Sequence, residues 1–373
     1  MTRQADFKRR VRARMARTGE SYAAARSRLL AEYPGMTLGD SPLDWTPEAL
    51  HISNGDATDV PGTGLARRVI YWRDALHEGP VPVAPPAELR RIRAEYLAGH
   101  TSAGHAEVIR QLTERDQVLE AGRDGEYVLW FEADLYDQLQ ITEILARLAG
   151  LGVPAGRITL ICIGEHPGIA RFGGLGELTA GQLRDLPHTS ACARLTPAAL
   201  ELATRAWAAF RAPAPQSLAA IAATRLGELR FLGEAFDRLS REYPAVRDGL
   251  ALTERRVLAA VADGAPDAGT AFVRAQARET RPYMGDSTCF ARMGQMSEGP
   301  HPLLRLDPPG LPVQRATGVR LTGTGERVLA GQADQVTLNG VDRWIGGVHL
   351  DGHHVPWRWD DGTEAIIGVP GKA

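Results

Sequence analysis

Strand-length apolar runs alternate with amphipathic segments between residues 48 and 190, and this alternation constrains the fold more than any other feature of the chain. The runs are rich in Val, Ile, Tyr and Trp, and they lie at 50–53, 69–72, 127–131 and 158–163. Helical periodicity is found at 87–98, 105–121 and 135–149. Strands that alternate with helices predict an α/β domain with a mostly parallel, Rossmann-like sheet.

The chain has 373 residues, which is too long for a single hydrophobic core, so we expect several domains or segments. We predict a basic helical hairpin at 1–35, a linker at 36–47, the α/β domain at 48–190, a helical segment at 191–243 and a last domain at 244–373. In the last domain, helices are expected at 253–263 (capped by Thr253), 270–280 and 286–297, and strands at 319–321, 327–329, 343–350 and 355–359. Helices before hairpins are typical of a winged-helix-like α+β domain.

Composition indicates a soluble cytoplasmic protein. Hydrophobic residues make up 44% and charged residues 24%, and no apolar run reaches the 18 residues of a membrane span. The three cysteines form no CxxC pair, and the N-terminal segment lacks the apolar core of a secretory signal. Residues 1–30 hold nine Lys or Arg against two acids, which suits either a solvated helix face or contact with nucleic acid.

Polar side chains follow three of the expected strands, in the segments His51–Asp56, Trp72–Pro82 and Trp130–Gln138. Ligands of open α/β sheets bind outside the carboxyl ends of the strands, so the three segments predict one cleft. We expect His77 to transfer protons, with Asp74 and Glu78 orienting it. The expected ligand-binding residues are Asn54, Gly55, Asp56, Arg73, Glu132 and Gln138, and the expected ligands of Mg²⁺ or Mn²⁺ are Asp56, Asp74 and Asp134.

A structural interpretation stands beside each of these assignments. Asp134 and Asp137 are placed to cap a helix that starts at Leu135, and Asn54-Gly55-Asp56 suits a tight turn. Arg73 stands next to Asp74, as a salt-bridge partner would. The sequence has no GxGxxG, GxxxxGK[ST] or GxSxG pattern, so nothing indicates a nicotinamide or flavin cofactor, a P-loop or an α/β-hydrolase serine.

These same three segments resemble the bacterial family known as domain of unknown function 1835, over residues 50–165. The segments 321–331 and 342–349 look like the longer members of that family. The resemblance supports the importance of these segments and implies no activity.

Three functional hypotheses are therefore open. The first is an enzyme or sensor for a phosphorylated or nucleotide-like small molecule, and as an enzyme it would be a metal-assisted hydrolase or transferase. The second is a nucleic-acid-binding regulator that uses residues 1–35 and the C-terminal domain, and the third is a scaffold that binds partner proteins without catalysis.

Overall fold

A computed structural model describes residues 45–100, 103–310 and 312–369, so the predicted hairpin at 1–35 and most of the predicted linker lie outside the described residues. The chain divides into two compact units. The first unit comprises the described residues up to Asp74, with Ala106–Ala133 and Gln140–Thr204. The second comprises Ala75–His105, Asp134–Leu139 and the described residues from Arg205 onward, so residues 75–105 group with the C-terminal part of the chain.

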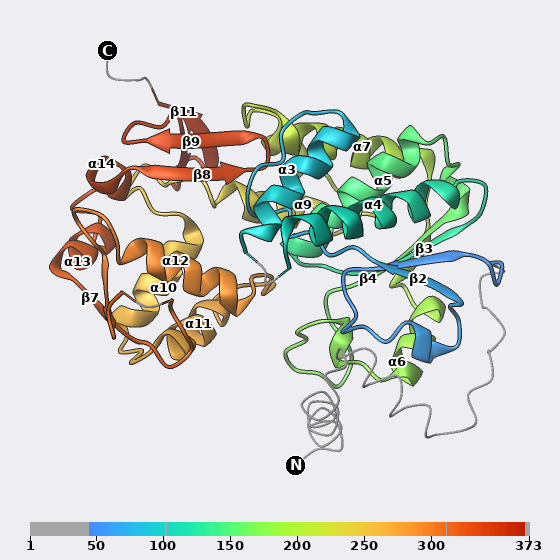
Figure 1. Ribbon diagram of the computed structural model, residues 1–373, viewed down its shortest axis with the longest axis horizontal. Coiled ribbons are helices and arrows are strands. Elements are labelled where there is room, and N and C mark those ends of the chain that lie inside the picture. Colours follow the sequence, from blue (N-terminus) through green and yellow to red (C-terminus); the bar gives the residue numbers. More distant parts are fainter. Residues whose placement is uncertain (1–44, 101–102, 311, 370–373) are drawn as a thin grey trace. The chain divides into compact units, whose positions relative to one another are not determined.

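The first unit is built on a five-stranded sheet in the order β2-β1-β3-β4-β5 (Figure 1). Its strands are β1 (Leu50–Ser53), β2 (Arg68–Tyr71), β3 (Tyr127–Glu132), β4 (Ile158–Ile163) and β5 (Cys192–Arg194). The first four run parallel, whereas β5 pairs antiparallel with β4 at the edge. The prediction of an α/β fold with a mostly parallel sheet is confirmed.

Both faces of this sheet are covered, as the sequence pattern of its strands requires. The hydroxyl of Tyr127 in β3 donates a hydrogen bond of 2.6 Å to the Leu119 carbonyl in α4 (His105–Ala121). The alternate residues Val128 and Trp130 point to the other face and belong to a buried cluster with Leu183 of α6 (Ala180–Asp185). The apolar and aromatic composition of β3 from Tyr127 to Phe131 follows from this burial on two sides.

A buried polar network around Trp72 joins the end of β2 to α4 and to α5 (Leu135–Gly150). The indole Nε1 donates to the Glu143 carboxylate at 2.8 Å, and the Arg115 guanidinium lies 3.7 Å above the ring centroid. Arg147 pairs with both Glu143 (2.8 Å) and Asp116 (3.0 Å). Charges of both signs are thereby matched inside the unit, which is the condition for burying them.

The second unit contains helices and three small antiparallel sheets, formed by the pairs β6–β7, β8–β9 and β10–β11. Its helices are α3 (Pro86–Ala98), α8 (Leu218–Ala222), α9 (Leu232–Ser240), α10 (Leu252–Ala262), α11 (Ala268–Gln276), α12 (Asp286–Met296), α13 (Gly323–Leu329) and α14 (Gln335–Asn339), and α7 (Pro197–Arg211) ends in it. Its strands are β6 (Leu304–Asp307), β7 (Gly318–Leu321), β8 (Val341–Ile345), β9 (Val348–Gly352), β10 (Trp357–Asp360) and β11 (Ala365–Gly368). None of the helices in the described ranges is both long and apolar enough to cross a membrane.

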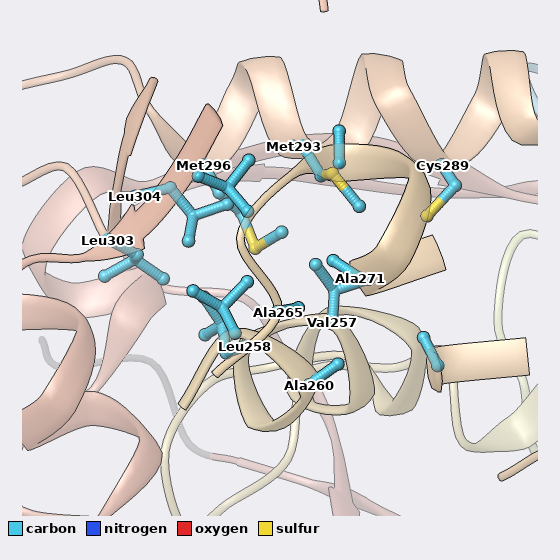
Figure 2. Close-up of a cluster of buried hydrophobic side chains, with 14 of the residues drawn as sticks. Val257, Leu258, Ala260, Ala265, Ala271, Cys289, Met293, Met296, Leu303 and Leu304 are labelled. Carbon is cyan, nitrogen blue, oxygen red and sulfur yellow. The ribbon is translucent and has the colours of Figure 1, made fainter. Parts of the chain in front are cut away.

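The core of the second unit lies between α10, α11, α12 and β6. Figure 2 shows Val257 and Leu258 of α10 beneath Met293 and Met296 of α12, with Leu304 of β6 beside them. Unbranched methionines fill an irregular space between helices well. The order of three helices followed by a hairpin was expected, and the described residues contain it, but this order alone does not establish a winged helix.

Three local predictions in this unit are wrong. Residues 327–329 end helix α13 and form no strand, because the Thr322 hydroxyl accepts the Gly325 N–H at 3.0 Å and starts a helix there. The expected strand at 343–350 is the hairpin β8–β9, since Gly346 turns the chain with a φ of +59°. Helix α10 begins at Leu252 with the Ala251 N–H bonded to the Glu254 carboxylate, so Thr253 is not its cap.

Met293→Ala tests the core in Figure 2. Met293 has no exposed surface, so its truncation should lower the free energy of unfolding by about 2–5 kcal/mol. Val273→Ala on the exposed side of α11 is the control and should change it little. Urea unfolding followed by circular dichroism measures both variants, and an equal loss in the two would contradict this core.

Candidate functional site

The predicted site residues at the sheet edge lie at the point where the strand order reverses. Strand β1 lies between β2 and β3, so the chain leaves β1 first to one side and then returns to the other. The segment Asn54–Asp56 follows β1, and Glu132 ends β3. Open α/β sheets bind ligands outside such a point.

Much of this edge is occupied by contacts within the first unit. Arg73 pairs with Asp56 at 3.1 Å, and its guanidinium lies 5.1 Å from the Tyr71 ring centroid. The Glu132 carboxylate accepts the Leu175 N–H at 2.7 Å. Arg73 therefore forms a salt bridge, as its structural interpretation predicted. Glu132 holds the loop that contains Leu175 through a hydrogen bond.

The loop that Glu132 holds contains Gly173–Gly176, which the sequence patterns left without a role. A Cβ atom on Gly174 would lie 2.5 Å from the Glu132 Oε2 atom, and the glycine has a φ of +139°. A Cβ atom on Gly176 would lie 3.2 Å from the Ala57 Cβ atom. The glycines thus allow the loop backbone to lie directly against the ends of β1 and β3.

In the second unit, the turn at Ala75–Pro80 is fixed by an arginine on α3. Arg93 is buried, and its guanidinium donates to the carbonyls of Glu78 (2.7 Å), Pro80 (3.3 Å) and Ala75 (3.1 Å). Gly79 has a φ of +69°, and a Cβ atom there would lie 2.5 Å from the Tyr96 ring. The charged turn is rigid because α3 packs against it.

His77, the predicted proton-transfer residue, is buried in this turn. Its side chain is 6% exposed and lies between the rings of Tyr136 and Tyr283, at centroid distances of 5.6 and 5.2 Å in edge-on geometry. Neither ring nitrogen has a hydrogen-bond partner among the described residues, and Nε2 lies 3.6 Å from the Glu78 Oε1 atom. Burial lowers the pKa of His77 to about 3, so the imidazole is neutral at neutral pH.

Glu78 lies next to His77 and is also nearly buried, with 11% of its side chain exposed. Its Oε2 atom accepts the Tyr96 hydroxyl at 3.4 Å, whereas Oε1 has no hydrogen-bond partner among the described residues. Burial raises the pKa of Glu78, and the positive charge of Arg292 opposes this rise. A buried carboxyl oxygen without a partner is rare in folded proteins and marks a position where a further group can bind.

Glu78 forms part of the wall of a pocket of about 600 Å³ inside the second unit. The other walls come from the end of α3, from α12 and from strand β8, and the polar or aromatic side chains among them are Tyr96, His100, Ser287, Thr288, Arg292, Gln295, Asp342, Arg343 and Trp344. Of the three predicted catalytic residues, only Glu78 lines this pocket, and His77 lies behind it.

Two arginines in this wall have unused donors. The Arg343 side chain is 9% exposed and pairs with Glu254 through Nη2, while its Nε and Nη1 atoms are buried without a hydrogen-bond partner among the described residues. Half-buried Arg292 makes no hydrogen bond or ion pair with the described residues. Burial and the neighbouring Arg292 charge lower the pKa of Arg343. An anion in the pocket would satisfy these donors and relieve the repulsion.

Sequence reasoning missed both arginines. Arg292 lies on an amphipathic helix, where a surface position is the usual interpretation of an arginine. Arg343 lies in the segment 342–349, which resembles the longer members of the family. This resemblance was the one sequence signal that could have pointed to Arg343. Their proximity is a tertiary property, since about fifty residues separate them in the chain.

The three predicted metal ligands are distributed over the two units. Asp56 and Asp74 belong to the first unit, and Asp134 belongs to the second. Asp134 accepts the Asp137 N–H at 3.0 Å, which confirms its predicted role as a helix cap, and burial raises its pKa to about 6. Within the described ranges, no group of three or more His, Cys, Asp or Glu side chains is placed to hold a metal ion, and the Mg²⁺ or Mn²⁺ site stays a prediction.

The remaining predicted residues have structural surroundings of their own. Buried Asp74 lies after β2, and its carbonyl accepts the Gln140 amide at 2.9 Å. Gln138 is buried on α5, and Asn54 and Gly55 are half-buried in the turn after β1. Whether any of them binds a ligand stays a prediction.

Comparison with known proteins adds no assignment. No model of a protein family matches the sequence, and a search of curated proteins finds no match. The resemblance to domain of unknown function 1835 therefore stays a prediction, and functional inference depends on the geometry of the residues.

Gly174→Ala tests the closure of the sheet edge by the glycine loop. The added Cβ would collide with the Glu132 carboxylate, so we expect a loss of about 2–4 kcal/mol in the free energy of unfolding. Gly168→Ala is the matched control, because Gly168 also has a positive φ of +84° but has open space around its Cβ position. Thermal unfolding of both variants measures the difference, and equal melting temperatures would contradict the close approach.

His77→Phe tests the burial of a neutral imidazole between two tyrosines. The pKa of His77 is about 3 in the folded protein and 6.5 for a free side chain, so between these values the unfolded state binds more protons. The free energy of unfolding should therefore fall as the pH drops from about 6.5 toward about 3. Because Phe cannot titrate, the variant should lose less stability than wild type on acidification, by about 3 kcal/mol at about pH 4.5.

At neutral pH the same variant should be as stable as wild type or more stable, because it removes two buried nitrogens without partners. Urea unfolding at neutral pH and at about pH 4.5 measures the stability of the variant and its loss on acidification. Exposed His188→Phe is the control and should keep the acid sensitivity of wild type. An unchanged acid sensitivity in His77→Phe would show that His77 is accessible to protons in the folded state.

Proposed function

We propose that the protein is an enzyme or ligand sensor that binds a phosphorylated small molecule, and that the pocket of the second unit holds the phosphate. Arg292 and Arg343 are the anion-binding groups in this proposal. The pocket volume of about 600 Å³ suits a small molecule. The proposed ligand class is the one expected from the sequence. The residues proposed to bind it lie in the pocket, whereas the sequence predicted a site at the sheet edge.

The observation that carries the proposal is the pair of arginines with unused donors in one pocket wall. Arg343 is nine-tenths buried with two guanidinium nitrogens unpartnered, and Arg292 has no ion pair among the described residues. By contrast, Arg238 of the same unit pairs with Glu242 and Glu279, each at 2.8 Å. Guanidinium groups bind phosphate oxygens through paired hydrogen bonds.

An enzymatic role would use Glu78 as the acid or base at the bound ligand. Its carboxyl group lines the pocket, and a raised pKa suits proton transfer near neutrality. His77 would then be a positioning residue, because its Nε2 atom lies behind Glu78 at 3.6 Å. At 3.6 Å the two atoms are too far apart for a hydrogen bond, and contacts between catalytic groups often shorten when a ligand binds.

The metal site, the cytoplasmic location and the winged-helix interpretation stay predictions alongside this proposal. Residues 244–373 are not basic overall, so the nucleic-acid hypothesis gains no support from charge. The proposal for a small anionic ligand depends on none of the three.

Arg292→Gln tests the proposal with inorganic phosphate and pyrophosphate as probes. Loss of one charged donor should weaken binding about 10- to 100-fold. Folding should be unaffected, because Arg292 makes no hydrogen bond or ion pair among the described residues. Isothermal titration calorimetry gives the affinities, and circular dichroism checks the fold.

Arg327→Gln is the matched control. Arg327 is an exposed arginine of the same unit and likewise has no side-chain partner among the described residues. This variant should bind the probes as wild type does. Equal affinities for wild type, Arg292→Gln and Arg327→Gln, or no binding by wild type, would overturn the proposed function.

A further inference from the structure

Glu78 and Arg292 line the same pocket. Arg292 makes no ion pair with the described residues, and Glu78 has only the neutral His77 as a neighbour at ion-pair distance. The Glu78 Oε1 atom is buried with no hydrogen-bond partner, apart from His77 at 3.6 Å. We propose that Glu78 binds the ligand as a neutral carboxylic acid and donates its O–H to a ligand oxygen, so that the protein takes up one proton when an oxyanion binds. This inference rests on the proposed function and adds the protonation state and donor that the site presents to its ligand.

The reason is electrostatic. Without a ligand, the positive charge of Arg292 favours the ionised form of Glu78. An oxyanion bound to Arg292 and Arg343 would neutralise that charge and place a second negative charge beside the carboxylate. Two anionic oxygens at hydrogen-bonding distance repel each other, and a proton between them converts the repulsion into a hydrogen bond.

The proton balance is simple. One proton leaves the solvent and bonds to a Glu78 carboxyl oxygen, and no other covalent bond forms or breaks. Oε1 is the oxygen with a free lone pair, because Oε2 already accepts the Tyr96 hydroxyl at 3.4 Å. The ligand class that suits this arrangement is an oxyanion with several acceptor oxygens, such as a phosphate monoester, because two arginines and one carboxylic acid then donate to different oxygens.

The other groups around Glu78 do not explain such a proton uptake, with one exception. Arg93 is bound to three backbone carbonyls of the turn, and Tyr96 remains protonated because burial raises its pKa to about 12. His77 is neutral and does not line the pocket. The exception is His100, an exposed side chain that stacks on Tyr96 at 4.2 Å and also lines the pocket.

On strand β8, Asp342 and Arg343 also face the pocket. Asp342 lies 2.8 Å from the His349 ring and is largely exposed, and Arg343 stays charged beside Glu254. The experiment therefore has to separate Glu78 from His100.

Sulfate is the probe, because it carries no proton between about pH 6 and about pH 8, so a pH-dependent affinity reports the protein alone. Calorimetry in buffers of different ionisation enthalpy counts the protons taken up. Wild type should take up close to one proton per sulfate, and its affinity should fall by up to about tenfold per pH unit above the pKa of Glu78.

Glu78→Gln is the decisive variant, since its amide keeps a donor and cannot titrate. We expect Glu78→Gln to bind sulfate with the same affinity at about pH 6 and about pH 8 and to take up no proton. His100→Gln should keep the pH dependence of wild type, whatever its absolute affinity. Binding by wild type without proton uptake would overturn the inference, as would a pH dependence that persists in Glu78→Gln or disappears in His100→Gln.

These outcomes are distinct from failure of the proposed function. If sulfate binds, is weakened by Arg292→Gln and shows no proton uptake, the anion site stands and the role of Glu78 is refuted. If wild type does not bind sulfate, or if Arg292→Gln has no effect, the anion site itself is refuted and the inference falls with it.

Discussion

Arg93 of α3 donates hydrogen bonds to three carbonyls of the turn at Ala75–Pro80, and the positions of His77 and Glu78 depend on this contact. Hydrogen bonds from a charged donor contribute about 1.5–3 kcal/mol each, more than most single contacts in a protein. They compensate for the burial of the guanidinium and satisfy partly buried carbonyls of a tight turn. As a result, the Glu78 carboxyl is held in the wall of the pocket even though its own oxygen Oε1 has no partner.

The second unit buries many charges, and most of them are paired. Glu242 illustrates this, because burial alone would raise its pKa, whereas Arg238 and the Thr253 hydroxyl hold the pKa at about 2. The unpaired polar atoms include those of His77, Glu78 and Arg343, which lie in or just behind one pocket. Proteins rarely leave buried polar groups unsatisfied, so the buried atoms of Glu78 and Arg343 that lack partners support a binding site at this pocket.

Much of the fold was predictable because it depends on local periodicity. The strand at 50–53 and the helix at 105–121 occur as expected, since each has a continuous apolar pattern of the right period. Strand β5 has three residues, too few for a pattern to show. Residues 327–329 look like a strand by composition, but Thr322, five residues before Arg327, caps a helix that continues through them.

The candidate site was predictable in part. The segment 72–82 was recognised because charged residues beside a Gly-Pro turn are conspicuous in any sequence. The role of Glu132 was not, since its contact with Leu175 spans 43 residues, and neither was the pocket formed by α3, α12 and β8. Such groupings arise from tertiary packing, which a single sequence does not encode in any local pattern.

The most direct test of the account is a crystal structure of the protein with bound tungstate, a heavy analogue of phosphate whose position is given by anomalous scattering. We expect a strong anomalous peak in the pocket, within hydrogen-bonding distance of Arg292, with Arg343 and Glu78 turned toward other oxygens of the same anion. An empty pocket in crystals that bind tungstate elsewhere would contradict the central claim.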